Sequence, residues 1–471
     1  MKPIIRTLAI LCITGLAAGC KKTFIQLAPV SNANAENFYK TKDDFDLAVA
    51  AAYNSLYTIY APEGAVSYAS EQMSDNAIVY NISGIEADKW AFKDYTLKPA
   101  NTMVYQFWQD FYKALFNINI VLAKIDDASL DAAYKTNVKA EMRFLRGLYY
   151  FDMVRLWGDL PIVTTPLTGA ESYGVLRSSQ AEVYNLIIGD LTFSMANLPL
   201  ASAITVKGKA SKGAAETLLG EVYLTQGNKT SAATVLQDVY NSTQYQLLPT
   251  YASVWGPTVK NTKESIFEIQ CIGGSATNPY SRYYQLFFPN TNIFTFYGGG
   301  MNQVTDDLYN EYESGDPRRD LSIALGYQNG ATFVNQKYTK KWTDAGAAIN
   351  GGNSLAGNNF MIYRYADLLL MLSEATGDAK YLNEVRTRVS LPLYGTPSYP
   401  AQYGTLALAI EHERRVELAI EFHRWFDLKR TNRAVTVLGA KGKNINQDKL
   451  LLPIPTIVRT QNDKITQNTG Y

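Results

Sequence analysis

The stretch "KGAAETLLGEVYLTQGNKTSAATVLQDVY", residues 212–240, decides the fold class of this chain. It contains two amphipathic runs separated by Gly-Asn, which predicts two helices joined by a short turn. Five positions match the spacing of a tetratricopeptide repeat of about 34 residues: Leu219, Gly220, Tyr223, Ala232 and Leu236. The match is partial, because Glu216 and Gln244 stand where the repeat usually has Trp and Pro. We predict that Gly220 is a close-contact position between the paired helices.

Helical periodicity continues outside this pair. Thr41 followed by Asp44 resembles a capping box ahead of an apolar run over 45–60. Further helices are predicted over 101–127, 137–157, 178–196, 209–226, 230–241, 361–376, 378–389 and 404–430. "FEIQCI", residues 267–272, fits a short strand. The chain is therefore predicted to be all-α, a tetratricopeptide-like helical-repeat scaffold with long irregular loop insertions.

Two stretches interrupt the helices, residues 61–100 and 245–360, and both are rich in Gly, Asn, Thr and aromatic residues. Loops longer than about 15 residues in a compact domain are usually functional or disordered. These are too aromatic for disorder. We divide the mature chain into an N-terminal helical region, 20–244, and a C-terminal region, 245–471, that carries the aromatic insertion.

Composition excludes some classes of partner. The 471 residues carry a formal net charge of +1, so no overall field attracts nucleic acid or an anionic membrane. Hydrophobic residues make up 47%, enough to bury a large core. The 33 tyrosines are unusual. Their flat apolar faces and polar tips suit interfaces and sugar rings, but a Tyr-rich helical core explains any one of them equally well.

The N-terminus predicts export. Lys2 and Arg6 precede an apolar run that ends in "LAAGC" at Cys20. This pattern is typical of a bacterial lipoprotein signal over 1–19, with cleavage before Cys20 and lipidation of its thiol. A plain secretory signal is the alternative. After cleavage Cys271 would be the single free thiol, so no intrachain disulfide is expected.

Motifs for catalysis or cofactors are absent from the sequence. No G-x-S-x-G elbow, phosphate loop, G-x-G-x-x-G or EF-hand loop occurs. His412-Glu413 begins like a zinc-protease helix, but the second histidine would stand at Val416, and His423 is too far along. We therefore expect no catalytic residue, no metal and no cofactor. Carboxylates near aromatics, such as Asp75, are weak candidates for glycoside hydrolysis.

The helix around His412 is better explained by structural ion pairs. Glu411 and Arg415 have the i,i+4 spacing of a helical ion pair. Glu417, Glu421 and Arg424 are predicted to form a satisfied polar seam beneath apolar neighbours.

Six stretches in order resemble the SusD/RagB family of outer-membrane nutrient-binding lipoproteins. They are "AEMRFLRGLYYFDMVRLWGDLPIV", "KGAAETLLGEVYLTQGN", "ESIFEIQ" with "DLYNEYESGDPRRD", "RYADLLLMLSEA", "ERRVELAIEFHRWFDLKR" and "LLPIPTIVRTQNDKITQNTGY". The similarity extends from Cys20 to the last residue. Lys21-Lys22 depart from the acidic residues that often follow the cysteine in surface-exposed relatives.

The resemblance implies an all-helical core of four tetratricopeptide-like units and a lipid anchor at the outer membrane, facing outward. It also implies a partner, a SusC-type TonB-dependent barrel over which the protein lies as a hinged lid. The implied ligands are oligosaccharides, or peptides in some members, bound noncovalently before import. The family motifs are scaffold motifs, so they assign no ligand contacts in this chain.

Candidate ligand contacts follow from the aromatic loops, above all from "NPYSRYYQLFFPNTNIFTFYGGG", residues 278–300. Aromatics stack on the C–H faces of sugars, while Asn, Asp and Arg bind hydroxyl groups. The candidates are Asp75, Asn76, Tyr80, Asn81, Trp90, Tyr280, Arg282, Tyr283, Tyr284, Tyr297 and Trp342. The same loop could instead be a plug that fills the core, and its phenylalanines (Phe287, Phe288 and Phe294) fit a plug better than its tyrosines.

Two other functions remain open from the sequence. The chain could be a lipoprotein of the same transport class that binds only peptide or protein, with the aromatic loops gripping the barrel. It could also be an exported glycan hydrolase on a helical scaffold.

Overall fold

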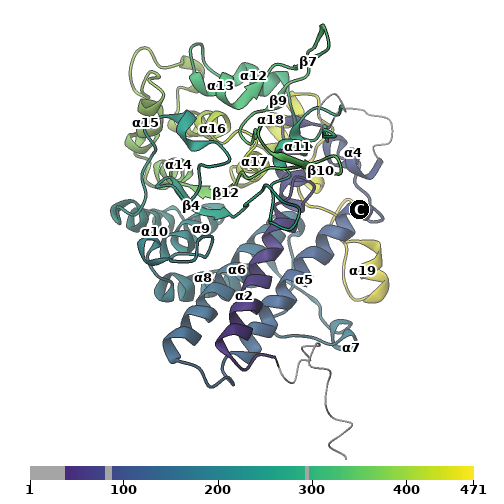
Figure 1. The fold of residues 1–471 in the computed structure, drawn as a ribbon. Helices are drawn as coiled ribbons and strands as arrows, with labels where there is room; N and C mark the ends of the chain where they lie inside the picture. Colours follow the sequence, from purple (N-terminus) through teal and green to yellow (C-terminus); the bar gives the residue numbers. More distant parts are fainter. Residues whose placement is uncertain (1–37, 80–86, 292–295) are drawn as a thin grey trace, which may run out of the picture.

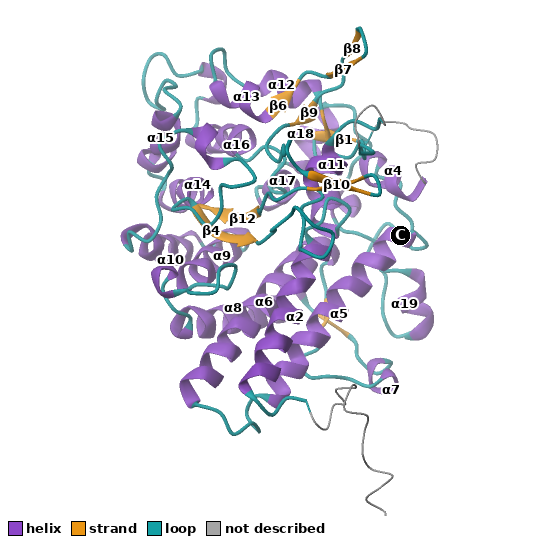
Figure 2. Ribbon diagram, in the orientation of Figure 1, coloured by secondary structure: helices purple, strands orange, loops and turns teal. Residues whose placement is uncertain are grey.

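The computed structural model describes residues 38–79, 87–291 and 296–471. Helices dominate this part of the chain (Figures 1 and 2). The longer helices are α2 (Lys42–Ile59), α5 (Thr102–Lys124), α6 (Ala132–Trp157), α8 (Gln180–Asn197), α9 (Lys212–Thr225), α10 (Lys229–Asn241), α14 (Tyr365–Thr376), α15 (Ala379–Arg388) and α16 (Leu406–Glu417). The all-α prediction is confirmed.

Shorter elements occupy the connections. The short helices are α3 (Ala65–Ser67), a π-helical turn η2 (Tyr68–Gln72), α4 (Ala87–Asp94), α7 (Gly169–Ser172), η3 (Ala201–Ala203), η4 (Tyr251–Val254), α11 (Tyr283–Phe287), α12 (Asp306–Glu311), α13 (Pro317–Ser322), η5 (Ala401–Tyr403), α17 (Arg424–Arg430), α18 (Ala434–Ala440), η6 (Gln447–Leu450) and α19 (Thr456–Gln461). The two predicted loops therefore contain several turns of helix.

The repeat prediction holds at atomic detail. Helices α9 and α10 pack against each other. A Cβ atom added to Gly220 would lie 2.4 Å from Cδ2 of Leu236, a distance that real Cβ contacts do not show. Gly147 of α6 is a second such position, where a Cβ would lie 3.0 Å from the Leu191 side chain of α8. Glycine is therefore needed where paired helices approach most closely.

Helix starts follow the side chains that cap them. Thr41 forms the predicted capping box with Asp44 ahead of α2. Ser211 caps α9, and its hydroxyl oxygen accepts a hydrogen bond of 3.0 Å from the backbone N–H of Ala214. These caps satisfy backbone donors that the first helical turn leaves without partners.

Strands are short and occur in pairs. Antiparallel pairs join β4 (Ser265–Ile269) to β12 (Phe360–Arg364), β1 (Ala77–Ile78) to β5 (Gln303–Val304), β2 (Leu160–Pro161) to β3 (Arg177–Ser178), β6 (Ile323–Ala324) to β9 (Tyr338–Thr339), β7 (Tyr327–Asn329) to β8 (Thr332–Val334) and β10 (Ala348–Asn350) to β11 (Asn353–Leu355). The strand predicted over 267–272 is confirmed, shifted toward the N-terminus. The β7–β8 hairpin projects from the top of the molecule (Figure 2).

Two predicted helices are divided. The helix expected over 361–376 begins at Tyr365, because Phe360–Arg364 pairs with β4 as a strand. The helix expected over 404–430 breaks after Glu417 and resumes at Arg424, with Ile420 and Phe422 at positive φ. The turned backbone exposes carbonyl groups to buried cations.

Those cations explain the break. A guanidinium N–H of Arg364 donates to the Glu417 carbonyl oxygen over 2.7 Å, and the Lys341 ammonium donates to the Ala419 carbonyl oxygen over 2.7 Å. A continuous helix would use both carbonyls in its own ladder. Helical periodicity could not reveal this, because both cations are remote in the sequence.

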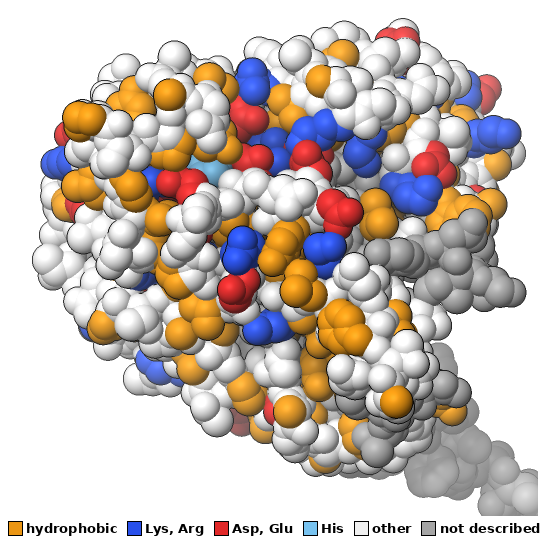
Figure 3. All heavy atoms as spheres, turned by 90° about the horizontal axis from the view of Figure 1, so that it is seen from above, with side chains coloured by type: hydrophobic (Ala, Val, Ile, Leu, Met, Phe, Trp, Pro, Cys, Tyr) orange, Lys and Arg blue, Asp and Glu red, His pale blue; other side chains and the backbone are white. Residues whose placement is uncertain are grey.

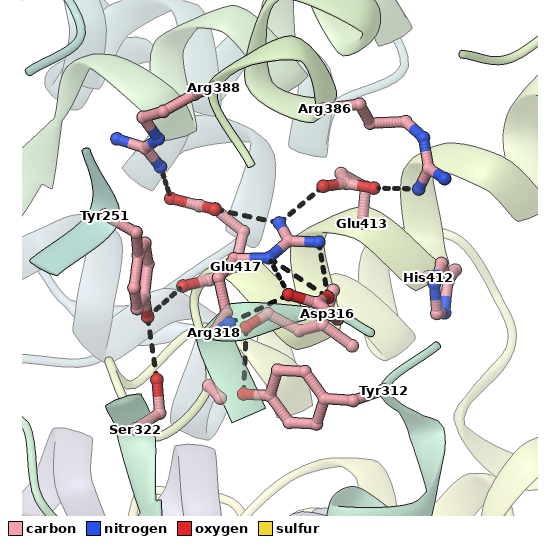
Figure 4. A network of polar contacts seen from close by, with 12 residues as sticks. Tyr251, Tyr312, Asp316, Arg318, Ser322, Arg386, Arg388, His412, Glu413 and Glu417 are labelled. Atoms are coloured by element: carbon pink, nitrogen blue, oxygen red, sulfur yellow. Dashed lines mark hydrogen bonds and ion pairs between the residues drawn. The ribbon is translucent and has the colours of Figure 1, made fainter. Parts of the chain in front are cut away.

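The polar seam is confirmed and is larger than predicted. Figure 4 shows Arg318 between the carboxylates of Asp316, Glu413 and Glu417, with Arg388 on the other side of Glu417. All are buried. Such pairs tolerate burial because every charge has an opposite charge and hydrogen bonds around it.

The predicted pair of Glu411 with Arg415 is wrong. Glu411 accepts from Arg424 and Arg433, whereas Arg415 pairs with carboxylates of other elements, including Asp75. The helical spacing was correct, but tertiary partners compete for both charges.

The hydrophobic core is continuous across the predicted boundary at residue 244/245. One cluster of buried side chains runs from Phe45 of α2 to Ile465 near the C-terminus. The division into two sequence regions stays a prediction. In the described part of the chain, no helix is long and apolar enough to cross a membrane.

Candidate functional site

The two aromatic loops of the sequence meet in space and form one unit, which we call the loop unit (residues 61–79, 87–100 and 278–291 with 296–305). Strands β1 and β5 pair antiparallel, with Ala77 opposite Val304 and Ile78 opposite Gln303. The side chain of Asn302 donates a hydrogen bond of 3.0 Å to the Ser67 hydroxyl and accepts one from Gln72. The sequence grouped both loops as candidates, and the structure places their described parts together.

The innermost layer of the loop unit is a plug. Tyr283 stacks on Phe360 with ring centroids 4.8 Å apart, and Trp342 stacks on the other side of this group, 5.6 Å from Phe360. Phe287 and Phe422 complete the cluster. Such offset and edge contacts are the arrangements that aromatic rings prefer in cores.

The plug corrects two candidates. Tyr283 is 5% exposed and Trp342 is 3% exposed, so the expectation of partly exposed rings is wrong for both. The prediction that phenylalanines are plug residues holds for Phe287 and Phe288, which are buried. The loop could not be resolved from its own letters, because Phe360 and Phe422, which bury Tyr283, are far along the chain.

A second layer lies over the plug. Tyr284 is half-buried and contacts Phe288 and Phe296, with centroid distances of 6.2 Å and 5.1 Å. Burial raises the pKa of the Tyr284 hydroxyl, and the charge of Asp344 raises it further. The phenol is therefore neutral and keeps a hydrogen-bond donor at the edge of the loop unit.

The outermost ring belongs to Tyr297, which is 65% exposed. Its backbone is held on both sides: its N–H donates to the Gly352 carbonyl over 3.1 Å, and its carbonyl accepts from the Gln285 side chain over 3.1 Å. A Cβ on Gly352 would lie 2.6 Å from the tyrosine ring. Tyr297 is therefore an exposed aromatic on a fixed support, as a ligand platform requires.

The support of Tyr297 was missed in the sequence. Strands β10 and β11 form a hairpin whose turn is Gly351-Gly352, and both glycines have positive φ. "NGGN", residues 350–353, is a strong two-residue hairpin signal that could have revealed it. Buried Gln285 also accepts from the N–H of Ser354, so it clamps the hairpin to α11.

Asp75 and Asn76 do not reach the surface. They are 2% and 1% exposed. Asp75 receives two hydrogen bonds from Arg424, of 2.8 Å and 3.0 Å, and Asn76 accepts from Arg415 over 3.0 Å. Their assignment as surface ligand contacts is corrected: both anchor the first loop to the C-terminal helices. The sequence could not show this, because the arginines are more than 330 positions away.

The electrostatics around Asp75 follow from this anchoring. Burial by itself raises the pKa of the Asp75 carboxyl, but Arg424, Arg415 and Lys441 hold it well below its usual range. A carboxylate so held is a poor proton donor or acceptor.

Three further candidates lie at intermediate or exposed positions. Tyr280 is half-buried, and Arg282 is exposed and paired with Glu63 over 2.7 Å. Trp90 of α4 is half-buried, and its indole N–H has no hydrogen-bond partner among the described residues. The ammonium of Lys93 lies 5.9 Å from the Trp90 ring centroid. These groups keep contacts free for a ligand.

Tyr80, Asn81 and Phe294 lie outside the described residues, as does Cys20. Their assignments stay predictions.

The helix of His412 holds a cluster of carboxylates. Ligand atoms of Glu313, His412 and Glu413 lie within 4.8 Å of one another. The His412 ring nitrogens lie 2.8 Å from Glu311 and 3.2 Å from Glu313, and Glu413 is paired with Arg386 at 2.7 Å. Burial lowers the pKa of His412, but its two carboxylate partners raise it above its usual value. An imidazolium and a guanidinium therefore supply the positive charge that a metal would.

Surface charge is mixed. On the face seen from above, acidic and basic side chains are interspersed around hydrophobic ones (Figure 3). Arg282–Glu63 is one such pair beside the aromatic candidates. Mixed charge favours neutral polar ligands over strongly charged ones.

Two family models match the chain. The model described as "Starch-binding associating with outer membrane" matches residues 31–224, and the model described as "SusD family" matches residues 324–471. The gap between them contains most of the second aromatic loop, which is consistent with binding loops grafted on a shared scaffold.

Similar proteins are known along the whole chain. SusD-like protein P38 of Formosa agariphila is 27% identical over 100% of this chain and 99% of its own. A SusD-like protein of Bacteroides ovatus is 24% identical over 88% of this chain and 80% of its own.

Solved structures agree with the fold. A structure titled "Laminarin binding SusD-like protein" is 30% identical, with a TM-score of 0.80, covering 92% of this chain and 100% of that chain. Surface glycan-binding protein A from Bacteroides fluxus is 22% identical with a TM-score of 0.79 over 92% of this chain and 100% of its own, a likeness of fold. With its helical repeats, its matched family segments and a 30% identical relative over nearly its full length, this chain belongs to the SusD/RagB family.

Proposed function

We propose that the protein binds oligosaccharides noncovalently through the loop unit and delivers them to a SusC-type TonB-dependent barrel, over which it lies as a lid. The observation that carries the binding part is the likeness to the laminarin-binding SusD-like structure, at 30% identity over 92% of this chain. The name of that relative concerns that relative; its scaffold and the aromatic loop unit make the same class of ligand our proposal here.

The geometry of the loop unit supports a saccharide ligand. Tyr297 presents an exposed ring on a backbone fixed by Gln285 and Gly352. A sugar can place its C–H face on that ring at little entropic cost to the protein. Arg282 and Glu63 offer a donor and an acceptor to hydroxyl groups, and together they carry no net charge.

Binding without catalysis is the simpler proposal. The carboxylates of the loop unit are occupied: Asp75 by Arg424, Asp306 by Lys337 and Asp307 by Arg415. A glycosidase needs one carboxylic acid with a raised pKa beside a second carboxylate. Opposed cations favour the ionised form instead.

Anchorage follows from the family description, which mentions association with the outer membrane, and from "LAAGC" at Cys20. We propose that the lipidated Cys20 tethers the protein to the outer membrane, outward-facing beside its barrel. The tether would keep the lid at high local concentration over the pore.

Isothermal titration of the purified protein with laminarin, soluble starch and a peptide mixture tests the binding proposal. We expect saturable binding of at least one glycan, with its chain length unchanged after incubation. Shortened glycan would favour a hydrolase. Binding of peptide alone would favour the peptide-binding alternative. Co-purification of a barrel with the tagged protein from membranes, lost after detergent washing of the Cys20→Ala variant, tests the partner.

A further inference from the structure

A groove outside the loop unit combines aromatic rings with charged groups of both signs. Its volume is about 630 Å³. It lies between α2 and α6, beneath the connection 203–210 and the end of β4. We call it the helix groove. Figure 1 shows α2 and α6 side by side, and contacts between them agree.

One face of each helix builds the groove. On α2, Tyr53 and Tyr57 are four residues apart, so their rings lie on the same side of the helix. On α6, Tyr134 and Glu141 are seven residues apart, again on one side. All three tyrosines are half-buried, so each keeps part of its ring toward the groove. Helices place these groups more rigidly than a loop does.

The polar groups of the groove are fixed by contacts at one end only. The Lys209 ammonium lies 3.1 Å from Oε1 of Glu141, and the Tyr134 hydroxyl donates to Asp46 over 2.9 Å. The Tyr53 hydroxyl accepts from the Ala210 N–H over 3.0 Å. These contacts orient the groups and leave further lone pairs and N–H groups for a ligand.

Glu141 supplies an independent sign of a missing partner. It is 1% exposed and lines the groove, yet its Oε2 has no hydrogen-bond partner among the described residues. A buried carboxylate oxygen without a partner is costly. Burial raises the pKa of Glu141, against the lowering effect of Lys209. A ligand hydroxyl donated to Oε2 would relieve this cost.

We propose that the helix groove is a second saccharide-binding subsite, with Tyr53, Tyr57 and Tyr134 facing sugar rings and Glu141 and Lys209 binding hydroxyl groups. The inference rests on the proposed glycan-binding function and adds a second site to it. Hydroxyl groups both donate and accept, so they match a carboxylate and an ammonium side by side. A strongly charged ligand would be repelled by one of the two.

The chain itself connects the groove to the loop unit. Glu268, Ile269 and Gln270 line the groove, and residues 271–282 continue from there into the loop unit. Ile272 is 65% exposed on this connection. A long glycan that occupies both sites would gain affinity from the linkage between them.

Two substitutions test the groove. Tyr57→Ala removes a ring whose hydroxyl makes no hydrogen bond within the described residues. Glu141→Gln removes the charge and keeps the shape. Leu47→Ala, on the same helix and 64% exposed outside the groove, is the matched control for Tyr57. Tyr173→Ala, 53% exposed on another surface, controls for the loss of any exposed tyrosine.

Titration with laminarin and soluble starch gives the readout. For whichever polysaccharide the parent binds, we expect Tyr57→Ala and Glu141→Gln each to weaken affinity at least tenfold, while both controls bind like the parent. If both groove variants bind like the parent, the inference is overturned and the proposed function stands. If the parent binds no glycan at all, the proposed function fails and the groove proposal fails with it.

A second measurement covers variants that lose stability. Hydroxyl-radical footprinting of the parent reports the solvent access of each tyrosine with and without polysaccharide. Protection of Tyr53, Tyr57 and Tyr134 supports the proposal. Protection confined to Tyr297, or protection of the groove by a co-purified barrel without glycan, overturns it.

Discussion

The hydroxyl of Tyr283 donates a hydrogen bond of 2.7 Å to the backbone carbonyl oxygen of Tyr60, across 223 positions of sequence. This contact fastens α11 of the second aromatic loop to the start of the first. The same ring stacks on Phe360. Tyr283 therefore joins the loop unit to the helical core, whereas Tyr297, only fourteen residues later, faces solvent.

The contrast between these two tyrosines gives the first prediction. Tyr283→Ala removes a buried ring and leaves the Tyr60 carbonyl without its partner, so we expect a loss of about 3–5 kcal/mol in the free energy of unfolding. Tyr297→Ala should leave the melting temperature nearly unchanged and weaken glycan affinity tenfold or more. Thermal unfolding and calorimetric titration of both variants give the test. Early melting of Tyr297→Ala with normal binding would make that ring structural.

Gly220→Leu gives the second prediction. The new side chain would collide with Leu236, since even a Cβ would lie 2.4 Å from it, so we expect a cost of about 1–3 kcal/mol or more. Gly189→Leu on the exposed side of α8 is the control, because no atom lies within 4 Å of its Cβ position. Denaturant midpoints of the two variants should move apart. Equal midpoints would contradict the close packing of α9 on α10.

The third prediction concerns pH. Burial raises the pKa of Glu71 to about 7, although the N–H of Phe422 donates to the carboxylate over 2.9 Å and opposes the shift. A raised folded-state pKa stabilises the protein below the unfolded value of 4.5, and this contribution is lost as pH rises through 7. Between those pH values the parent should lose about 3 kcal/mol relative to Glu71→Gln. Denaturation of both proteins at pH 4.5, 6 and 8 measures it. Parallel curves would show that Glu71 is not so shifted.

The fourth prediction tests the anchoring carboxylate. Asp75→Asn leaves Arg424, Arg415 and Lys441 facing a neutral group, so we expect a loss of about 3–5 kcal/mol at pH 7. The folded pKa of Asp75 is depressed, so its contribution is present above 3.8 and is lost as pH falls below that value. The gap between parent and variant should narrow in acid. Asp94→Asn, whose Lys93 pair is exposed, should cost less than about 1 kcal/mol.

The fifth prediction concerns the anchor. Two or more acyl chains are needed for stable membrane anchorage. Cys20→Ala should therefore move the protein from the membrane fraction to the soluble fraction, as immunoblotting of separated fractions would show. A variant that stays with the membrane would contradict lipidation as the tether.

Much of the scaffold could be predicted because its rules are local. A capping box needs only Thr41 and Asp44, and a close helix pair needs a small residue opposite a large one, as with Gly220 and Leu236. Both patterns repeat within tens of residues, where helical periodicity relates sequence spacing directly to spatial neighbours. The sequence therefore determined the helical class, the repeat and most helix positions.

The tertiary structure alone decided which polar and aromatic side chains are exposed. Asp75 has the composition of a ligand contact, but Arg424 lies 349 positions away and pairs with it inside the protein. Tyr283 and Tyr297 share one aromatic stretch, yet Phe360 buries the first and the Gly351-Gly352 turn displays the second. Exposure is set by partners brought from remote segments, and helical or strand periodicity carries no information about contacts of that range.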